Sequence, residues 1–224
     1  MGLFKRNRYR MNLKNFSAFQ YKLFCKAEGS QHIVSEFALY HILKLIEKYS
    51  VKSVLEVGLG IGTISGSILK YAEKSGKNIS CVGTESNDFC LRQIPSNLGS
   101  NYKKLKIIPE VSQMDSTAKF DLIIVDGAEN NLELVKDMIA KNGILLIEGD
   151  RSGQEKTIKK VFPDTKFVHL ISLKRNGDYS VKRAQDYRGG LKVLFIDTNF
   201  NQKIHWAELR LKSAFKAQIR KNFT

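Results

Sequence analysis

The 224-residue sequence contains little of what defines several large classes of protein. Its three cysteines are odd in number and form no Cys-x-x-Cys pair, which argues against a disulfide framework and against a thiolate zinc site. It has no run of eighteen apolar residues, and its N-terminus carries charge where a signal peptide has its apolar stretch. The sequence therefore predicts a cytoplasmic protein with reduced thiols.

Proline is scarce too, and no linker rich in Pro, Gly or Ser divides the chain. Hydrophobic residues make up 42% and charged residues 26% of the sequence, which is typical of a folded globular protein. The chain is too short for two domains of ordinary size. We expect one domain over residues 1–224, with a basic N-terminal extension (1–30), a core (31–197) and a basic amphipathic C-terminal helix (203–223).

The net charge of +15 is concentrated in three segments. Residues 1–27 carry seven basic and no acidic residues, 174–190 carry five against two, and 203–224 carry six against one. Segregated positive charge is typical of a surface that binds phosphate, in nucleic acid or in anionic lipid, but a solvated charged face shows the same pattern. Both interpretations stay open at this point.

The C-terminal segment also has an apolar side. At 100° per residue its large apolar residues fall within a sector of about 120°. These residues are Ile204, Leu211, Phe215, Ile219 and Phe223. Such a helix most often packs its apolar face on the domain; the alternative, together with 1–27, is an anionic membrane surface, which would place the protein at the inner face of a membrane.

Short runs rich in Val and Ile recur along the chain and are predicted to be buried strands. They cover 53–57, 79–83, 105–109, 120–126, 143–148, 166–172 and 191–197. Stretches with helical spacing lie between the first five, including a helix at about 31–49 before the first strand, which favours parallel strands joined by crossovers. The last two strands are separated only by polar residues, which indicates an antiparallel hairpin. The predicted fold is an α/β, Rossmann-like, doubly wound seven-stranded sheet, mostly parallel with one antiparallel strand in a C-terminal hairpin.

Local signals predict where some helices begin and end. Gly76 and Gly143 fall where a left-handed residue is needed at a helix C-terminus. The segment from Ser152 to Glu155 has the form of a capping box, in which the two side chains satisfy backbone donors at a helix N-terminus.

The first predicted strand ends in a turn rich in glycine. Glu56, Gly58, Gly60 and Gly62 occupy alternate positions. Glycines let the backbone turn sharply from strand to helix and let a ligand approach the free N–H groups of that helix, although a tight turn without a ligand is the simpler interpretation. The third glycine comes one residue too early for the Gly-x-Gly-x-x-Gly of dinucleotide sites.

This motif resembles motif I of the class I S-adenosylmethionine-dependent methyltransferases, whose sheet also ends in an antiparallel hairpin. The resemblance covers roughly residues 30–197, and its other well-matched segments are the acid Glu85 after the second strand, 120–127 and 141–150. It implies S-adenosylmethionine as cofactor, with Glu85 accepting hydrogen bonds from both ribose hydroxyls and either Glu110 or Asp115 near the adenine. The implied cofactor-binding residues are Glu56, Gly58, Gly60, Gly62, Glu85 and Asp126.

Within this class the chain is most similar to small-molecule O-methyltransferases, including the catechol type and its bacterial relatives. The resemblance implies methylation of a hydroxyl on a small-molecule, sugar or lipid-linked acceptor. Asp126, Glu148 and Asp150 are the candidate catalytic residues, with Asp126 the first candidate for the base. The Asp-Asn metal pair and the lysine of the catechol type have no counterpart, so we expect no metal and activity that persists in EDTA.

The basic segments keep a second interpretation open, an RNA-binding protein or RNA methyltransferase. Base methyltransferases usually follow the fourth strand with Pro-Pro and an aromatic residue that stacks a flipped base. Here residues 126–129 read Asp-Gly-Ala-Glu, which does not match, whereas a ribose methyltransferase has no such signature.

Overall fold

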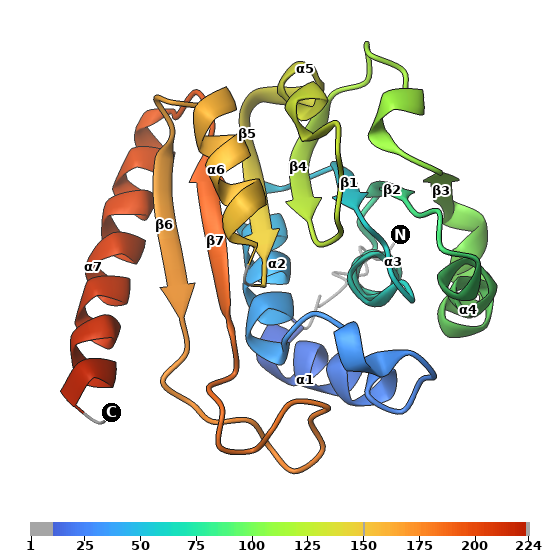
Figure 1. Ribbon diagram of the computed structural model, residues 1–224, viewed down its shortest axis with the longest axis horizontal. Coiled ribbons are helices and arrows are strands. Elements are labelled where there is room, and N and C mark those ends of the chain that lie inside the picture. Colours follow the sequence, from blue (N-terminus) through green and yellow to red (C-terminus); the bar gives the residue numbers. More distant parts are fainter. Residues whose placement is uncertain (1–10, 150, 223–224) are drawn as a thin grey trace, which may run out of the picture.

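The computed structural model describes residues 11–149 and 151–222 (Figure 1). Within these ranges seven strands form a mixed sheet in the order β3-β2-β1-β4-β5-β7-β6. The strands are β1 Ser53–Val57, β2 Ser80–Thr84, β3 Leu105–Ile108, β4 Phe120–Val125, β5 Ile139–Glu148, β6 Lys166–Ile171 and β7 Gly190–Phe195. β7 runs antiparallel to both of its neighbours, and the other pairs are parallel. The predicted sheet and its C-terminal hairpin are confirmed.

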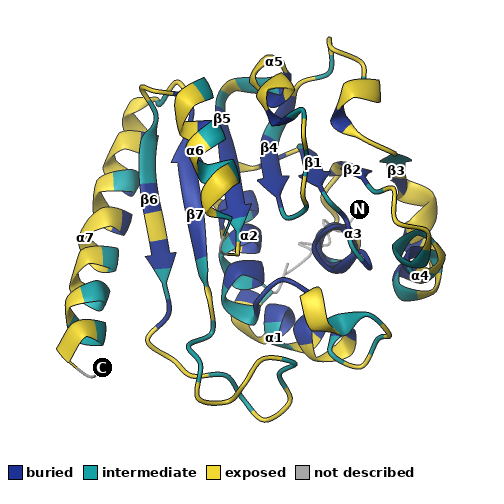
Figure 2. Ribbon diagram, in the orientation of Figure 1, coloured by how far each residue is buried: buried dark blue, intermediate teal, exposed yellow. Residues whose placement is uncertain are grey.

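Helices cover both faces of the sheet. They are α1 Leu13–Phe24, α2 Glu36–Tyr49, α3 Thr63–Ser75, α4 Asp88–Leu98, α5 Val135–Met138, α6 Ser152–Val161 and α7 Phe200–Asn222. Side chains of β1 alternate between two buried clusters, so that Val54 packs with α1, α2 and α3, and Leu55 packs with α5 and α6 on the other face. Figure 2 shows the central strands, such as β4 and β7, largely buried between these layers, whereas the edge strand β6 is partly exposed.

The N-terminal helix belongs to the packed core. Leu13, Phe16, Tyr21 and Phe24 of α1 are buried in the cluster that includes α2 and α3. The core therefore begins before residue 31, where we had expected a basic extension to end. Basic residues of α1 hide this role in the sequence, because they lie between its apolar positions.

Two predicted helix signals are wrong and one is confirmed. Gly76 ends α3 with a φ of 65°. Gly143 lies inside β5, which starts directly after the four-residue α5; a Cβ there would lie 2.6 Å from Ile139 Cγ1, and the pairing with β4 shifts register nearby. The Ser152 side chain does not cap α6, and Glu155 instead forms ion pairs with Lys159 and Lys192.

The long helix α7 lies alongside β6 at the edge of the sheet (Figure 1). It packs through Gln202, His205 and Leu209, which are buried. Most of the predicted apolar sector does not face the domain, because Ile204, Leu211 and Phe215 are exposed; Ile219 is half-buried, and Phe223 lies outside the described residues. The interpretation that this sector packs on the domain is therefore wrong. Among the described helices, none is long and apolar enough to cross a membrane.

Candidate functional site

A cavity of about 720 Å³ opens at the carboxyl ends of β1, β2 and β4. Strand order reverses there, because β1 lies between β2 and β4, and open α/β sheets bind ligands at such a point. Its walls are the glycine turn after β1, the segments that follow β2, β3 and β4, Arg151, and residues from Gly29 to Val34 before α2.

The three glycines of the turn have positive φ angles but different surroundings. A Cβ on Gly58 (φ 87°) would lie 2.2 Å from Gly127 Cα, and one on Gly62 (φ 86°) would lie 2.7 Å from Leu98 Cδ1. Gly60 (φ 53°) has no atom within 4 Å of its Cβ position. Two of the glycines therefore permit close packing of the protein with itself, and Gly60 is the one that leaves space for a ligand.

Glu85, directly after β2, is held by the backbone. Its Oε2 accepts a hydrogen bond from Gly60 N at 2.7 Å, and its Oε1 accepts from Ser86 N at 3.0 Å and Asn87 N at 2.8 Å. These bonds fix the carboxylate at the cavity wall, beside the open glycine. A carboxylate oxygen can accept two hydrogen bonds, so Oε2 keeps one acceptor site for a ligand hydroxyl.

Glu56 lies under the same turn and is fully buried. Its Oε2 accepts from Ser65 N at 2.8 Å and from Ser65 Oγ at 2.5 Å. Burial raises the pKa of Glu56 to about 8, against the effect of these hydrogen bonds. Among the described residues, Glu56 Oε1 has no hydrogen-bond partner, and neither has the buried Thr63 Oγ1 at the cavity wall. Buried oxygens of this kind are costly unless a bound ligand satisfies them.

Asp126, after β4, lines the cavity with a side chain that is 11% exposed. Burial, reinforced by the Glu148 and Glu56 carboxylates, raises its pKa above the ordinary value, and Arg151 opposes the shift. Arg151 bridges two strand ends: its guanidinium donates to Asp126 O, lies 3.3 Å from Asp126 Oδ1, and donates through Nε to Glu148 O at 2.9 Å. A carboxylate with a raised pKa in a cavity can accept a proton near neutral pH.

The other candidate residues lie in different places. Glu148 does not line the cavity; its Oε1 accepts from Ser35 N at 3.1 Å and ties the end of β5 to the start of α2. Asp150 lies outside the described residues. Glu110 lines the cavity, whereas the exposed Asp115 bonds to Thr117 N and Oγ1. In the described part of the chain, no group of three or more His, Cys, Asp or Glu side chains could hold a metal ion.

Two parts of the site were missed in the sequence analysis. Arg151 reaches the cavity because α6 starts beside the end of β4. The sequence analysis considered only acidic residues that follow strands, so it did not find this arginine. The segment from Gly29 to Val34 lines the cavity and packs against Phe89. The approach is close, because a Cβ on Gly29 (φ 82°) would lie 2.6 Å from Phe89 Cε1. The glycine at position 29, ahead of the predicted helix at 31–49, was the available signal.

Comparison with solved structures identifies the fold as that of the class I S-adenosylmethionine-dependent methyltransferases. An O-methyltransferase from Bacillus cereus in complex with SAH matches with a TM-score of 0.55 and 11% identity, covering 83% of this chain and 91% of that one. An SAH-bound methyltransferase from Podospora anserina matches with a TM-score of 0.54 and 14% identity, covering 82% and 88%. A "putative RNA methyltransferase" from Pyrococcus horikoshii matches with a TM-score of 0.53 and 15% identity, covering 83% of this chain and 97% of that one.

No known protein-family model matches the chain, and no curated protein matches it in sequence. The similarity is therefore one of fold, at 11–15% identity. It confirms the fold that the glycine motif and the strand pattern predicted.

Proposed function

We propose that the protein is an S-adenosylmethionine-dependent methyltransferase that methylates a hydroxyl group on a small-molecule, sugar or lipid-linked acceptor. The observation that carries this proposal is the open position of Gly60 beside the fixed carboxylate of Glu85, at the switch point of a methyltransferase fold. The 720 Å³ of the cavity is within the size range of small-molecule sites.

The residues of the cavity fit this cofactor. Glu85 Oε2 would accept from a ribose hydroxyl at its remaining acceptor site, since Oε1 already accepts from two backbone N–H groups. Glu110 lines the cavity and is the better candidate for the adenine than Asp115, which does not. The unpartnered Thr63 Oγ1 at the cavity wall supplies an acceptor for a donor group of the ligand, whereas Glu56 does not line the cavity and would support the turn through Ser65. Gly58 and Gly62 would act indirectly, by keeping the turn in shape.

S-adenosylmethionine supplies an electrophilic methyl group on a positively charged sulfur. Asp126 would orient the acceptor hydroxyl and take up its proton as the new oxygen–carbon bond forms. Arg151 would hold Asp126 in place and oppose the rise of its pKa. Glu148 would support this site indirectly, by tying the end of β5 to Ser35 N, and no metal is required by these roles.

RNA is the second candidate acceptor, because the chain has a net charge of +15 and shares its fold with the Pyrococcus horikoshii protein. A ribose 2′-hydroxyl would use Asp126 in the same way as a small-molecule hydroxyl. The two classes differ in salt dependence, since RNA affinity falls linearly with salt on logarithmic axes as phosphate contacts release counterions.

The experiment is transfer of a labelled methyl group from S-adenosylmethionine to separated small-molecule, lipid and RNA fractions of a cell extract, in EDTA. We expect label in the small-molecule or lipid fraction, and at least about a hundredfold less with Asp126→Asn. Asp115→Asn is the matched control, because that carboxylate lies outside the cavity, and it should retain activity. Label in the RNA fraction alone would move the proposal to RNA, and no label in any fraction would contradict it.

A further inference from the structure

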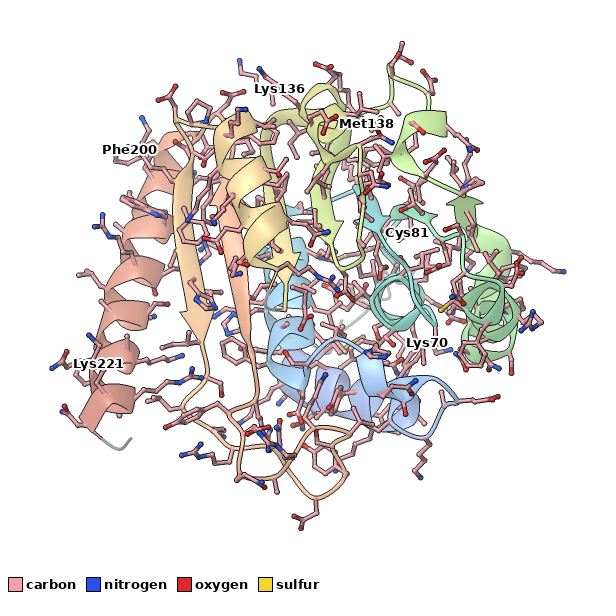
Figure 3. The ribbon with its side chains drawn as sticks, viewed as in Figure 1. Lys70, Cys81, Lys136, Met138, Phe200 and Lys221 are labelled. Carbon is pink, nitrogen blue, oxygen red and sulfur yellow. The ribbon has the colours of Figure 1, made fainter. Side chains whose placement is uncertain are left out.

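Helix α7 carries a row of large apolar side chains that face away from the protein. Phe200, Ile204, Leu211 and Phe215 are between 54% and 74% exposed, and at 100° per residue they fall within a sector of about 60°. We call these four residues the α7 stripe. Figure 2 shows that most of α7 is exposed, and Figure 3 labels Phe200 and Lys221 near its two ends. Several large exposed apolar side chains on one side of a helix are typical of an interaction site.

The helix cannot turn this stripe inward, because its other side is fixed to the protein. Trp206 Nε1 donates to Phe167 O at 2.8 Å, and His205 Nδ1 lies 2.7 Å from the Tyr49 hydroxyl. Near the other end, Arg220 Nε donates to Ser172 O at 2.9 Å. These contacts hold α7 along its length, so the stripe is presented outward by a rigid element.

Basic residues border the stripe on one side. Lys203, Arg210 and Lys221 lie within about 20° of one another on the helix, about 60–80° from Phe200. All three are exposed. Across the stripe, Lys212 is paired with Glu208, the only acid of α7. The surface thus has an apolar centre, a positive border, and little negative charge to neutralise that border.

This arrangement fits a lipid surface better than the other partners that a basic surface attracts. A single-stranded nucleic acid stacks successive bases on neighbouring aromatic side chains, whereas the two aromatic residues of the stripe, Phe200 and Phe215, lie at its two ends with aliphatic residues between them. A second copy of the chain would bring its own net charge of +15. An anionic bilayer suits both the stripe and its basic border. The apolar side chains would lie at the boundary of the acyl chains, and the basic side chains would lie at the lipid headgroups.

We propose that α7 lies in the plane of an anionic membrane surface, with its stripe inserted and with Lys203, Arg210 and Lys221 at the lipid phosphates. A helix with a large apolar side and a basic side suits the plane of a bilayer surface. This inference does not depend on the methyltransferase proposal, since it rests on the outer face of α7 alone.

The test is sedimentation with phosphatidylcholine vesicles, with and without phosphatidylglycerol, at physiological salt. We expect the full chain to sediment with the anionic vesicles and to stay in the supernatant with the neutral ones. The double variant Leu211→Ser/Phe215→Ser should weaken binding at least about tenfold, because it removes two inserted side chains. Lys203→Gln/Arg210→Gln/Lys221→Gln should weaken it about fivefold for each residue.

Phe19→Ser/Leu23→Ser is the matched control, since these side chains of α1 are also exposed, at 55% and 48%. It should bind like the wild type. Trp206 is the single tryptophan, so unchanged emission shows that α7 is still docked in the Leu211→Ser/Phe215→Ser variant. Arg210 lies 5.3 Å from the centre of the Trp206 ring, so urea unfolding checks the fold of the triple variant instead. No sedimentation of the wild type, or an equal loss in the control, would overturn the proposal.

RNA binding is tested with the same variants and a labelled single-stranded oligonucleotide. If the stripe variant leaves vesicle binding unchanged while the triple variant loses RNA affinity, the basic border serves RNA and the membrane proposal is wrong.

Discussion

The two halves of the sheet are held together in different ways. Around β1 and β2 the site is built from backbone: glycines with positive φ, and a carboxylate at a strand end bonded to N–H groups of its own turn. Around β5, β6 and β7 the contacts join side chains far apart in the sequence, such as Arg188 with Glu36 and Tyr21 with Ser180. Local backbone contacts therefore shape the candidate cofactor site in the first half. In the second half, contacts between side chains far apart in the sequence hold the surrounding structure together.

The largest expected effect comes from a glycine of the first half that packs on the protein. Gly58→Ala puts a Cβ 2.2 Å from Gly127 Cα at a φ of 87°, and we expect about 3 kcal/mol or more of lost stability. Urea unfolding measures this loss. Gly76→Ala is the control, because it has a similar φ of 65° and open space; it should cost about 1 kcal/mol. Equal losses in both would show that backbone strain alone accounts for the effect.

A buried acid of the same half should make stability depend on pH. The pKa of Glu56 is about 8 in the folded protein and 4.5 in the unfolded chain, so the folded state binds the extra proton between these values. Stability contributed by this group is therefore lost as pH rises from about 4.5 to 8. Glu56→Gln should remove this slope and be more stable than the wild type at pH 8, by a few kcal/mol at most. Parallel profiles for the two proteins from urea unfolding at pH 5 and pH 8 would refute this.

A smaller effect is expected at the carboxylate of the turn. Glu85→Ala should weaken binding of S-adenosylmethionine by about 1–3 kcal/mol, because charge-assisted hydrogen bonds to the ligand are lost. Calorimetry measures it, with Asp115→Ala as the control that should bind like the wild type. The loss of affinity in Glu110→Ala should lie between those of Glu85→Ala and Asp115→Ala. A larger loss in Asp115→Ala than in Glu110→Ala would assign Asp115, not Glu110, to the adenine.

The smallest effect belongs to the second half. Arg188 Nη1 lies 2.7 Å from Glu36 Oε1, and the two side chains are 24% and 14% exposed. Arg188→Gln should cost about 1 kcal/mol of stability and leave affinity for the cofactor unchanged, since neither residue lines the cavity. A change in affinity as large as that of Glu85→Ala would show that the two halves are coupled.

The same difference explains what could be predicted from the sequence. The strands, the hairpin and the glycine turn follow local rules of periodicity and backbone conformation, and they were found. The roles of the three glycines were not separable, because the neighbours Gly127 and Leu98 come from other parts of the chain. Arg151 and the segment from Gly29 to Val34 reach the cavity through tertiary packing, which leaves no local pattern.

The outward face of α7 was missed for a related reason. Its most apolar sector was expected to pack on the domain, as such sectors usually do. The helix packs instead through polar and amphipathic residues, among them Gln202, His205 and Trp206, which find specific partners on Asn142, Tyr49 and Phe167. Hydrophobic periodicity identifies the apolar side of a helix. In α7, the hydrogen-bond partners available to the opposite side determine which side is buried.

Calorimetric titration with S-adenosylhomocysteine tests the central claim most directly, comparing the wild type with Gly60→Val and Gly76→Val. Both glycines have positive φ and open space at the Cβ position, and Gly60 alone of the two lines the cavity. The account predicts binding to the wild type and to Gly76→Val, and no detectable binding to Gly60→Val. Absence of binding to the folded wild type, or equal binding to all three proteins, would contradict it.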